Sequence, residues 1–191
     1  SAYLASYLGL DRTDLFPVDG PLDLRALLSV VQTEGYETLR DESWRPVPSP
    51  LVESKEPLFP QIAERDILLV HPYESFDPVV KFLEDAADDP DVMAIKQVLY
   101  RTASGSRIVE ALIRSAQAGK LVTVLIELKA RFDEARNITQ ARRLEQAGVQ
   151  VVYGVRGLKT HAKVSVVVRR EPQGIVRYMH FGTGNYNERT A

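Results

Sequence analysis

The sequence predicts an α/β fold in which a mixed β-sheet is flanked by helices, and three observations support this prediction. Apolar runs of strand length alternate with stretches of helical apolar spacing between residues 66 and 153, as in a mostly parallel sheet. Two more strand-like runs, at 162–170 and 175–181, are separated by turn residues and are typical of an antiparallel pair. With 45% hydrophobic and 26% charged residues, the chain has the composition of an ordinary globular protein.

Residues 1–60 differ in pattern from the rest and are predicted to be a separate segment. Residues 22–31 have the apolar spacing of a helix, and Asp23 is placed where it favours the helix start. Five of the eleven prolines lie in residues 45–61, and this spacing excludes a long helix or a central strand there. We therefore expect the end of an element whose main body lies elsewhere, then a proline-rich connector, and a sheet domain that spans residues 61–191.

Within the sheet domain, strands and helices are predicted to alternate regularly. Asp77 and Pro78 are favourable residues for a helix start, and Gly119 and Gly148 each end a helical stripe. Strands of the parallel part are expected at 67–70, 92–100, 121–128 and 149–153. Helices between them are expected at about 77–87, 108–116 and 138–147.

Composition excludes several classes of protein. There is no cysteine, so disulfides and thiolate metal sites are excluded. No apolar run approaches the ~20 residues that a membrane-spanning helix needs, and residues 1–14 lack the pattern of a signal peptide. We expect a cytoplasmic protein without a transmembrane segment, and peripheral association with a membrane stays open.

Positive charge is concentrated in one part of a chain whose net charge is −2. Residues 146–170 contain no Asp or Glu but several Lys and Arg residues. In an open α/β sheet, ligands bind beyond the carboxyl ends of the parallel strands. The cations in the loops expected there are Arg101, Lys129, Arg131, Arg156 and Lys159. Their joint placement predicts a site for a phosphate-bearing ligand, because arginine and lysine match phosphate oxygens.

His161 and Lys163 open the apolar run 164–168, and on a strand they would point to the same side. A neutral imidazole is a competent phosphoryl acceptor, and a lysine ammonium would offset the charge of the phosphate under attack. Asn185 lies in the glycine-bracketed loop 182–187, whose backbone N–H groups are suited to an anion.

Other candidate groups have competing interpretations. His180 either supports the site or packs against the sheet, and His71, in a loop, is the weakest candidate among the histidines. The histidine spacings do not suggest a zinc site. Ion pairing with nearby arginines is a simpler role than a glycosidase-type carboxylate pair for Glu127, Asp133 and Glu134.

Five strings of the sequence are specific enough to be compared as a set. They are His71-Pro72-Tyr73-Glu74-Ser75-Phe76, Ile95-Lys96-Gln97-x-Leu99-Tyr100-Arg101, Glu127-Leu128-Lys129-Ala130-Arg131-Phe132-Asp133-Glu134, Gly157-Leu158-Lys159-Thr160-His161-Ala162-Lys163 and Gly182-Thr183-Gly184-Asn185-Tyr186-Asn187. Together they resemble the bacterial polyphosphate kinase family, which is built on tandem phospholipase D-like domains. The resemblance runs from about residue 66 to residue 191, and residues 1–60 resemble the end of that family's preceding helical domain.

The resemblance implies an ATP–polyphosphate phosphotransferase with a phospholipase D-like half-site. His161 matches the histidine that takes the γ-phosphoryl group of ATP and passes it, reversibly, to polyphosphate. Lys163 and Asn185 match residues that contact the transferred phosphoryl group. His180 matches a second family histidine, for which a supporting role is expected.

The resemblance also implies the ligands. Arg101 and Arg131 match arginines that hold phosphates near a magnesium site, and the charge pattern adds Lys159 as a phosphate-binding residue. The expected partners are ATP, ADP and inorganic polyphosphate, with Mg²⁺ as the cofactor and no nucleic acid. The full-length protein is expected to be a homo-oligomer.

The chain departs from the family in length, because the full enzyme is several times longer and has a second half-site. We therefore expect a fragment that is inactive alone. One alternative is a phospholipase D-like phosphodiesterase or nuclease that works as a dimer of half-sites. Another is a non-catalytic module that binds polyanions, with the salt sensitivity that counterion release produces.

Overall fold

The computed structural model describes residues 2–41, 45–101, 105–127, 134–155 and 157–188. The chain divides into two units, Ser1–Trp44 and Arg45–Ala191. The predicted division at residues 60 and 61 stays a prediction, although residues 45–60 group with the second unit. In the described residues, no helix combines the length and the apolar character needed to cross a bilayer.

The first unit consists of short helices with little buried surface. Helices α1 (Ala2–Leu8) and α2 (Leu28–Val31) are joined by irregular chain and by 3₁₀ turns at Arg12–Asp14 and Leu24–Leu27, and a third 3₁₀ turn, Glu37–Leu39, follows α2. The predicted helix at 22–31 is therefore a 3₁₀ turn that continues into α2, and the side chain of Asp23 accepts a hydrogen bond from the Arg25 N–H as expected. Most of its large apolar side chains are exposed, so this unit contributes little to a hydrophobic core.

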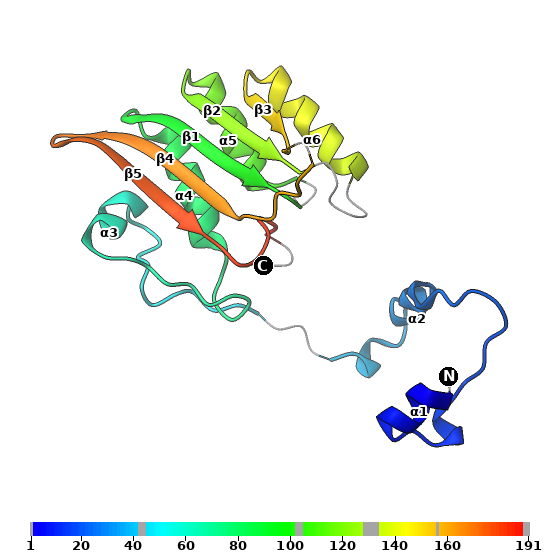
Figure 1. The fold of residues 1–191 in the computed structure, drawn as a ribbon. Coiled ribbons are helices and arrows are strands. Elements are labelled where there is room, and N and C mark those ends of the chain that lie inside the picture. Colours follow the sequence, from blue (N-terminus) through cyan, green and yellow to red (C-terminus); the bar gives the residue numbers. More distant parts are fainter. Residues whose placement is uncertain (1, 42–44, 102–104, 128–133, 156, 189–191) are drawn as a thin grey trace. The chain divides into compact units, whose positions relative to one another are not determined.

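The described residues of the second unit form a five-stranded mixed sheet with the order β3-β2-β1-β4-β5 (Figure 1). The strands are β1 (Val92–Leu99), β2 (Leu121–Ile126), β3 (Gln150–Tyr153), β4 (Val164–Glu171) and β5 (Gly174–Phe181). β1, β2 and β3 are parallel, whereas β4 pairs antiparallel with both β1 and β5. The mixed sheet that the sequence predicts is therefore confirmed.

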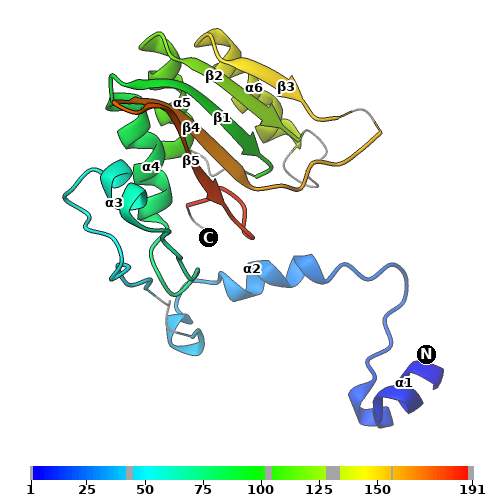
Figure 2. The ribbon, with the colours of Figure 1, turned by 60° about the vertical axis from the view of Figure 1, so that its left-hand side comes forward.

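Helices α4 (Asp77–Asp88), α5 (Arg107–Gln117) and α6 (Glu134–Gln146) lie along the same face of the sheet (Figure 2). In α5, Ile108, Val109 and Leu112 are fully buried, as the predicted apolar stripe requires. Gly119 and Gly148 follow α5 and α6 with positive φ angles of 83° and 87°, a conformation that glycine adopts without strain and that ends a helix.

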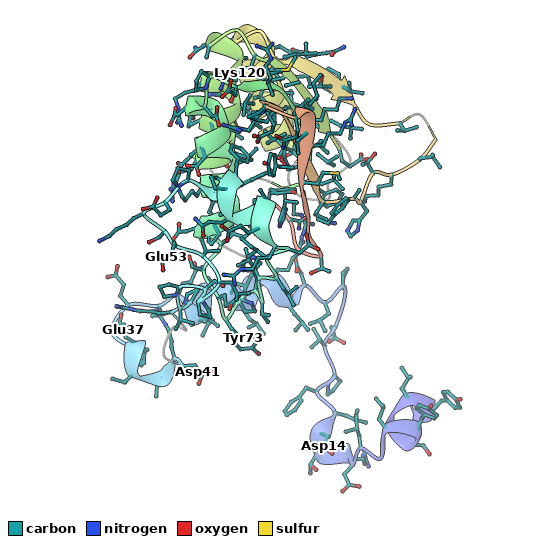
Figure 3. All side chains as sticks on the ribbon, turned by 90° about the vertical axis from the view of Figure 1, so that its left-hand side faces the viewer. Asp14, Glu37, Asp41, Glu53, Tyr73 and Lys120 are labelled. Carbon is teal, nitrogen blue, oxygen red and sulfur yellow. The ribbon has the colours of Figure 1, made fainter. Side chains whose placement is uncertain are left out.

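Lys120 stabilises the end of α4 from the start of β2 (Figure 3). Its ammonium donates at 2.7 Å to the Ala86 carbonyl, one of those that a helix leaves unpaired at its C-terminus, and also to the carbonyl of Asp89, the residue after α4. Partial burial lowers the pKa of Lys120, although Asp89 and Asp88 act in the opposite direction.

The predicted strand at 67–70 is wrong, because this segment is irregular chain that follows α3. Its N–H and C=O groups at Val70 bond to Glu74, at 2.9 Å and 2.8 Å, rather than to a neighbouring strand. Leu68 is 73% exposed. A short apolar run is consistent with a buried strand, but a strand also needs a partner, and the described chain offers none here.

The proline-rich connector contains a helix that the sequence did not indicate, α3 (Leu58–Glu64). Pro60 is tolerated because it lies in the first helical turn, where its missing N–H has no partner to lose. The Leu58 N–H donates to the Asp85 carboxylate at 2.8 Å, which ties α3 to α4. The Phe59 ring packs against those of Phe82 and Tyr178, with centroid distances of 5.7 Å and 4.9 Å.

We expect Phe59→Ala to lower the free energy of unfolding by about 3–5 kcal/mol, because it leaves a cavity among buried rings. Urea unfolding measures this change. Leu68→Ala, at an exposed position of the same unit, is the matched control and should change stability by less than about 0.5 kcal/mol. Equal effects of the two substitutions would show that the connector does not pack on the sheet unit.

Candidate active site

The candidate site lies at one edge of the sheet, where several strand ends meet. Parallel pairing aligns Leu99 with Ile126, so β1 and β2 end together. β4 runs the opposite way and therefore begins at this edge, and β5, whose Phe181 pairs with Val164, ends there. The segment that precedes β4 consequently meets the residues that directly follow β1 and β2, namely Tyr100 and Glu127, and the segment that follows β5 returns to it (Figure 1).

His161 and Lys163 touch each other at this edge. β4 begins at Val164, so both residues lie in the irregular chain before it rather than on the strand that the sequence predicted. The Lys163 Nζ atom is 3.0 Å from His161 Nδ1 and donates to the His161 carbonyl at 2.6 Å. The histidine is exposed, whereas Lys163 is only 6% exposed, and this burial lowers the pKa of the lysine.

The Tyr100 ring, at the end of β1, gathers the other predicted cations of the described chain. The centroid of this ring lies 5.2 Å from the His161 ring centroid, with an edge-to-face arrangement. Lys163 Nζ, Lys159 Nζ and Arg101 Cζ lie over the ring at 5.3, 5.6 and 5.7 Å from its centroid. The structure thus brings together four of the predicted site residues. Arg131, Lys129 and Arg156 lie outside the described residues.

Two buried polar side chains fix the loops around this cluster. The Asn137 side-chain amide donates to the carbonyls of Tyr100 and Glu127, at 2.9 Å and 3.0 Å. Glu127, buried after β2, accepts a hydrogen bond at 2.8 Å from the Thr160 N–H. Glu127 is therefore better placed to support the 157–163 loop than to act as a glycosidase-type acid. Asp133 and the Glu134 side chain lie outside the described part of the chain.

His180 belongs to a chain of polar groups under the site. Its Nδ1 atom is 2.7 Å from the Tyr186 hydroxyl, whose oxygen accepts a hydrogen bond from Gln97. The hydroxyl proton is therefore directed at Nδ1, which leaves the ring proton of His180 on Nε2. Burial and the neighbouring His71 lower the pKa of His180 to about 4, so the ring is neutral at pH 7. Burial also raises the pKa of Tyr186.

The loop after β5 joins His180 to Lys163. The Gly182 N–H donates to the Lys163 carbonyl at 2.9 Å. A Cβ atom at Gly182 would lie 3.2 Å from His180 Cε1, so a larger residue would force the His180 ring to shift, whereas Lys163 Cβ at 3.6 Å would be in ordinary contact. Within the described residues, the buried Asn185 Oδ1 has no hydrogen-bond partner. It lines a pocket of about 510 Å³ together with His180 and His71.

His71, the weakest histidine in the sequence, lies on the wall of this pocket. Its Nδ1 atom is 3.0 Å from the Glu74 carbonyl and so carries the ring proton. Sequence reasoning also passed over Tyr100 and Tyr186. Tyr100 directly precedes Arg101 at the end of β1, and Tyr186 directly follows Asn185 in the glycine loop. This adjacency to a predicted site residue is the signal in the sequence that could have identified both tyrosines.

The pKa of His180 predicts a pH dependence of stability. The unfolded histidine binds a proton below about pH 6.5, whereas the folded one does so only near pH 4. The free energy of unfolding should therefore be highest above pH 6.5 and fall by up to about 3 kcal/mol as the pH drops to 4. Urea unfolding between pH 4 and 8 measures it.

The matched variants are His180→Asn, which cannot titrate, and His161→Asn at an exposed position. The first should flatten the dependence on pH, and the second should leave it unchanged. Identical curves for His180→Asn and the unsubstituted protein would contradict a buried neutral histidine.

Comparison of the chain with known proteins identifies a family. A family model described as polyphosphate kinase C-terminal domain 1 matches residues 57–191. Polyphosphate kinase of Rhodopirellula baltica is 60% identical over 189 residues, which cover 99% of this chain and 22% of that protein. Polyphosphate kinase 1 of Chlorobaculum tepidum is 48% identical over 187 residues, which cover 98% of this chain and 27% of that protein.

A solved structure extends the likeness to the fold. The crystal structure of polyphosphate kinase from Porphyromonas gingivalis matches with a TM-score of 0.71 and 35% sequence identity, over 93% of this chain and 30% of that one. The chain thus spans about a quarter of the length of these relatives. Because the family model matches well over half of the sequence, the chain belongs to the polyphosphate kinase family.

Proposed function

We propose that this chain carries part of the active site of an ATP–polyphosphate phosphotransferase, and that His161 carries the phosphoryl group. One observation supports this proposal most strongly. The exposed His161 imidazole lies at the head of β4, 3.0 Å from the Lys163 ammonium and edge-on to a ring that gathers two more cations. A nucleophile surrounded by fixed positive charge is what transfer between polyanions requires.

The proposed reaction has two steps at His161. A ring nitrogen attacks the γ-phosphorus of ATP, and the bond to the bridging oxygen breaks, so that ADP leaves with the electron pair. A terminal phosphate oxygen of polyphosphate then attacks the phosphorus and the P–N bond breaks. Both steps are in principle reversible, because the phosphohistidine can also return its phosphoryl group to ADP.

The contact with Lys163 must be broken before either nitrogen of the His161 ring can react. An ammonium that donates to Nδ1 leaves the ring proton on Nε2, and neither nitrogen then has an available lone pair. When the ammonium turns to another acceptor, the lone pair of Nδ1 becomes available, and attack by Nε2 would additionally require the ring proton to move from Nε2 to Nδ1. An incoming γ-phosphate offers that acceptor, so substrate binding would both release the nucleophile and place the lysine against the developing charge.

The remaining residues would hold phosphate groups. Arg101 and Lys159 offer donors from the loops that follow β1 and precede β4, and Arg131 is proposed to act with them. His180 has its proton on Nε2 and would donate a neutral hydrogen bond, with Asn185 beside it on the pocket wall. Neutral donors add contacts without adding charge that would slow product release.

Mg²⁺ would neutralise charge on the phosphates when it is bound. Among the described residues, no group of three or more His, Asp or Glu side chains is placed to hold a metal ion. Guanidinium groups carry no acceptor, so Arg101 and Arg131 would bind the phosphates beside the ion rather than the ion itself.

The proposal concerns a full-length protein that contains this chain, because the relatives are about four times longer. A phospholipase D-type site needs two half-sites, and we propose that the 191-residue chain alone is inactive. For this chain alone, polyanion binding is the activity that the cations around Tyr100 favour. A cytoplasmic, homo-oligomeric full-length protein remains part of the proposal.

The test is labelling of the full-length protein with ATP that carries a radioactive γ-phosphate. We expect acid-labile, base-stable label on the protein, which His161→Ala abolishes. Lys163→Met should slow labelling by about a hundredfold, because one preorganised charge is lost. Lys55→Met, at an exposed lysine, is the matched control and should label at the original rate.

Label that survives in His161→Ala would refute the phosphohistidine. Hydrolysis of a model phosphodiester without ATP would instead support a phospholipase D-like phosphodiesterase.

A further inference from the structure

Tyr100 has no assigned role, yet it occupies the centre of the cationic cluster. Among the described residues, three cationic side chains lie over its ring within 5.7 Å of the centroid, and the His161 ring approaches it at 5.2 Å. Two segments supply these cations, namely the residues after β1 and the segment before β4. They are Arg101, Lys159 and Lys163.

The position of the Tyr100 ring is fixed by the sheet and not by the cations. Tyr100 directly follows β1 and is 8% exposed. Its carbonyl accepts a hydrogen bond from Asn137, whose amide also holds the carbonyl of Glu127 after β2. The ring is therefore a rigid surface against which flexible side chains can be placed.

The two lysines of the cluster lack the usual partner of a cation. In the described part of the chain, no carboxylate lies within ion-pair distance of Lys159 or Lys163. A carboxylate would neutralise each lysine and would compete with phosphate for its donors. The face of an aromatic ring attracts a cation through its quadrupole and carries no net charge. It can therefore hold an ammonium in place without neutralising its charge.

We propose that Tyr100 is a positioning residue that holds Lys159, Lys163 and Arg101 for the phosphate groups of a polyanion. The ring takes the place that a carboxylate would occupy in an ordinary ion pair. It also contacts the His161 ring in an edge-to-face arrangement, so one side chain touches both the nucleophile and its cations. This proposal rests on the proposed function for the identity of the polyanion, which is inorganic polyphosphate.

The experiment measures binding of inorganic polyphosphate to the full-length protein, over a range of salt concentrations, for Tyr100→Phe and Tyr100→Leu. The phenylalanine keeps the ring face and should bind within about twofold of the original protein. The leucine removes the ring face and should bind about tenfold or more weakly, with a shallower dependence on salt, because fewer cations meet the phosphates. Tyr36→Leu, at an exposed tyrosine, should leave binding unchanged.

A second variant keeps the test decisive if Tyr100→Leu fails to fold. Pentafluorophenylalanine at this position preserves the shape of the ring and reverses the sign of its quadrupole, so it should weaken binding as leucine does. Unchanged binding with either the leucine or the fluorinated ring would overturn the proposal. So would equal weakening by Tyr100→Phe and Tyr100→Leu, since the hydroxyl would then be the part that matters.

Binding is measured without ATP, so the result does not depend on phosphoryl transfer. Failure to label His161 would refute the phosphohistidine but not the role of Tyr100. Loss of polyphosphate binding in Tyr100→Leu, with the salt dependence described, would support that role in either case.

Discussion

Antiparallel pairing of β4 with β1 is the constraint on which the candidate site depends. The pair places Ser165 opposite Gln97, so the chain that enters β4 lies beside the chain that leaves β1. In a fully parallel sheet, His161 and Tyr100 would lie at opposite edges. Because β4 also pairs antiparallel with β5, the glycine loop returns to the same edge. The chemistry of the site is therefore a consequence of strand direction.

The elements that the sequence predicted well are those with both a periodic pattern and a capping residue. Helix α4 begins at Asp77 as expected, and the buried stripe of α5 matches its spacing. The predicted strand at 67–70 had an apolar run but no neighbouring strand, and α3 was missed because prolines were interpreted as breakers. Both errors concern tertiary context, namely where a segment finds hydrogen-bond partners and which turn of a helix a proline occupies.

For the site, the spacing of His161 and Lys163 in the sequence was enough to predict that the two side chains lie together, although the structural reason is different. The sequence argument assumed a strand, whereas the contact is made in irregular chain before β4. The contacts of Tyr100 and Tyr186 could not be predicted, because their partners are distant in sequence. Tyr100 contacts Lys159, and Tyr186 accepts a hydrogen bond from Gln97. A residue type reveals its chemistry, but only the fold reveals which neighbours it acts upon.

The amide nitrogen of Asn137 links two segments of the candidate site. It bonds to the carbonyl of Tyr100 and to the carbonyl of Glu127, and thus to the residues that directly follow two adjacent strands. Glu127 in turn holds the Thr160 N–H, one residue before His161. One or two hydrogen bonds, together with the Glu127 side chain, therefore connect each of these three segments to the others. We therefore expect a phosphate chain that pulls on one of these segments to displace the other two as well.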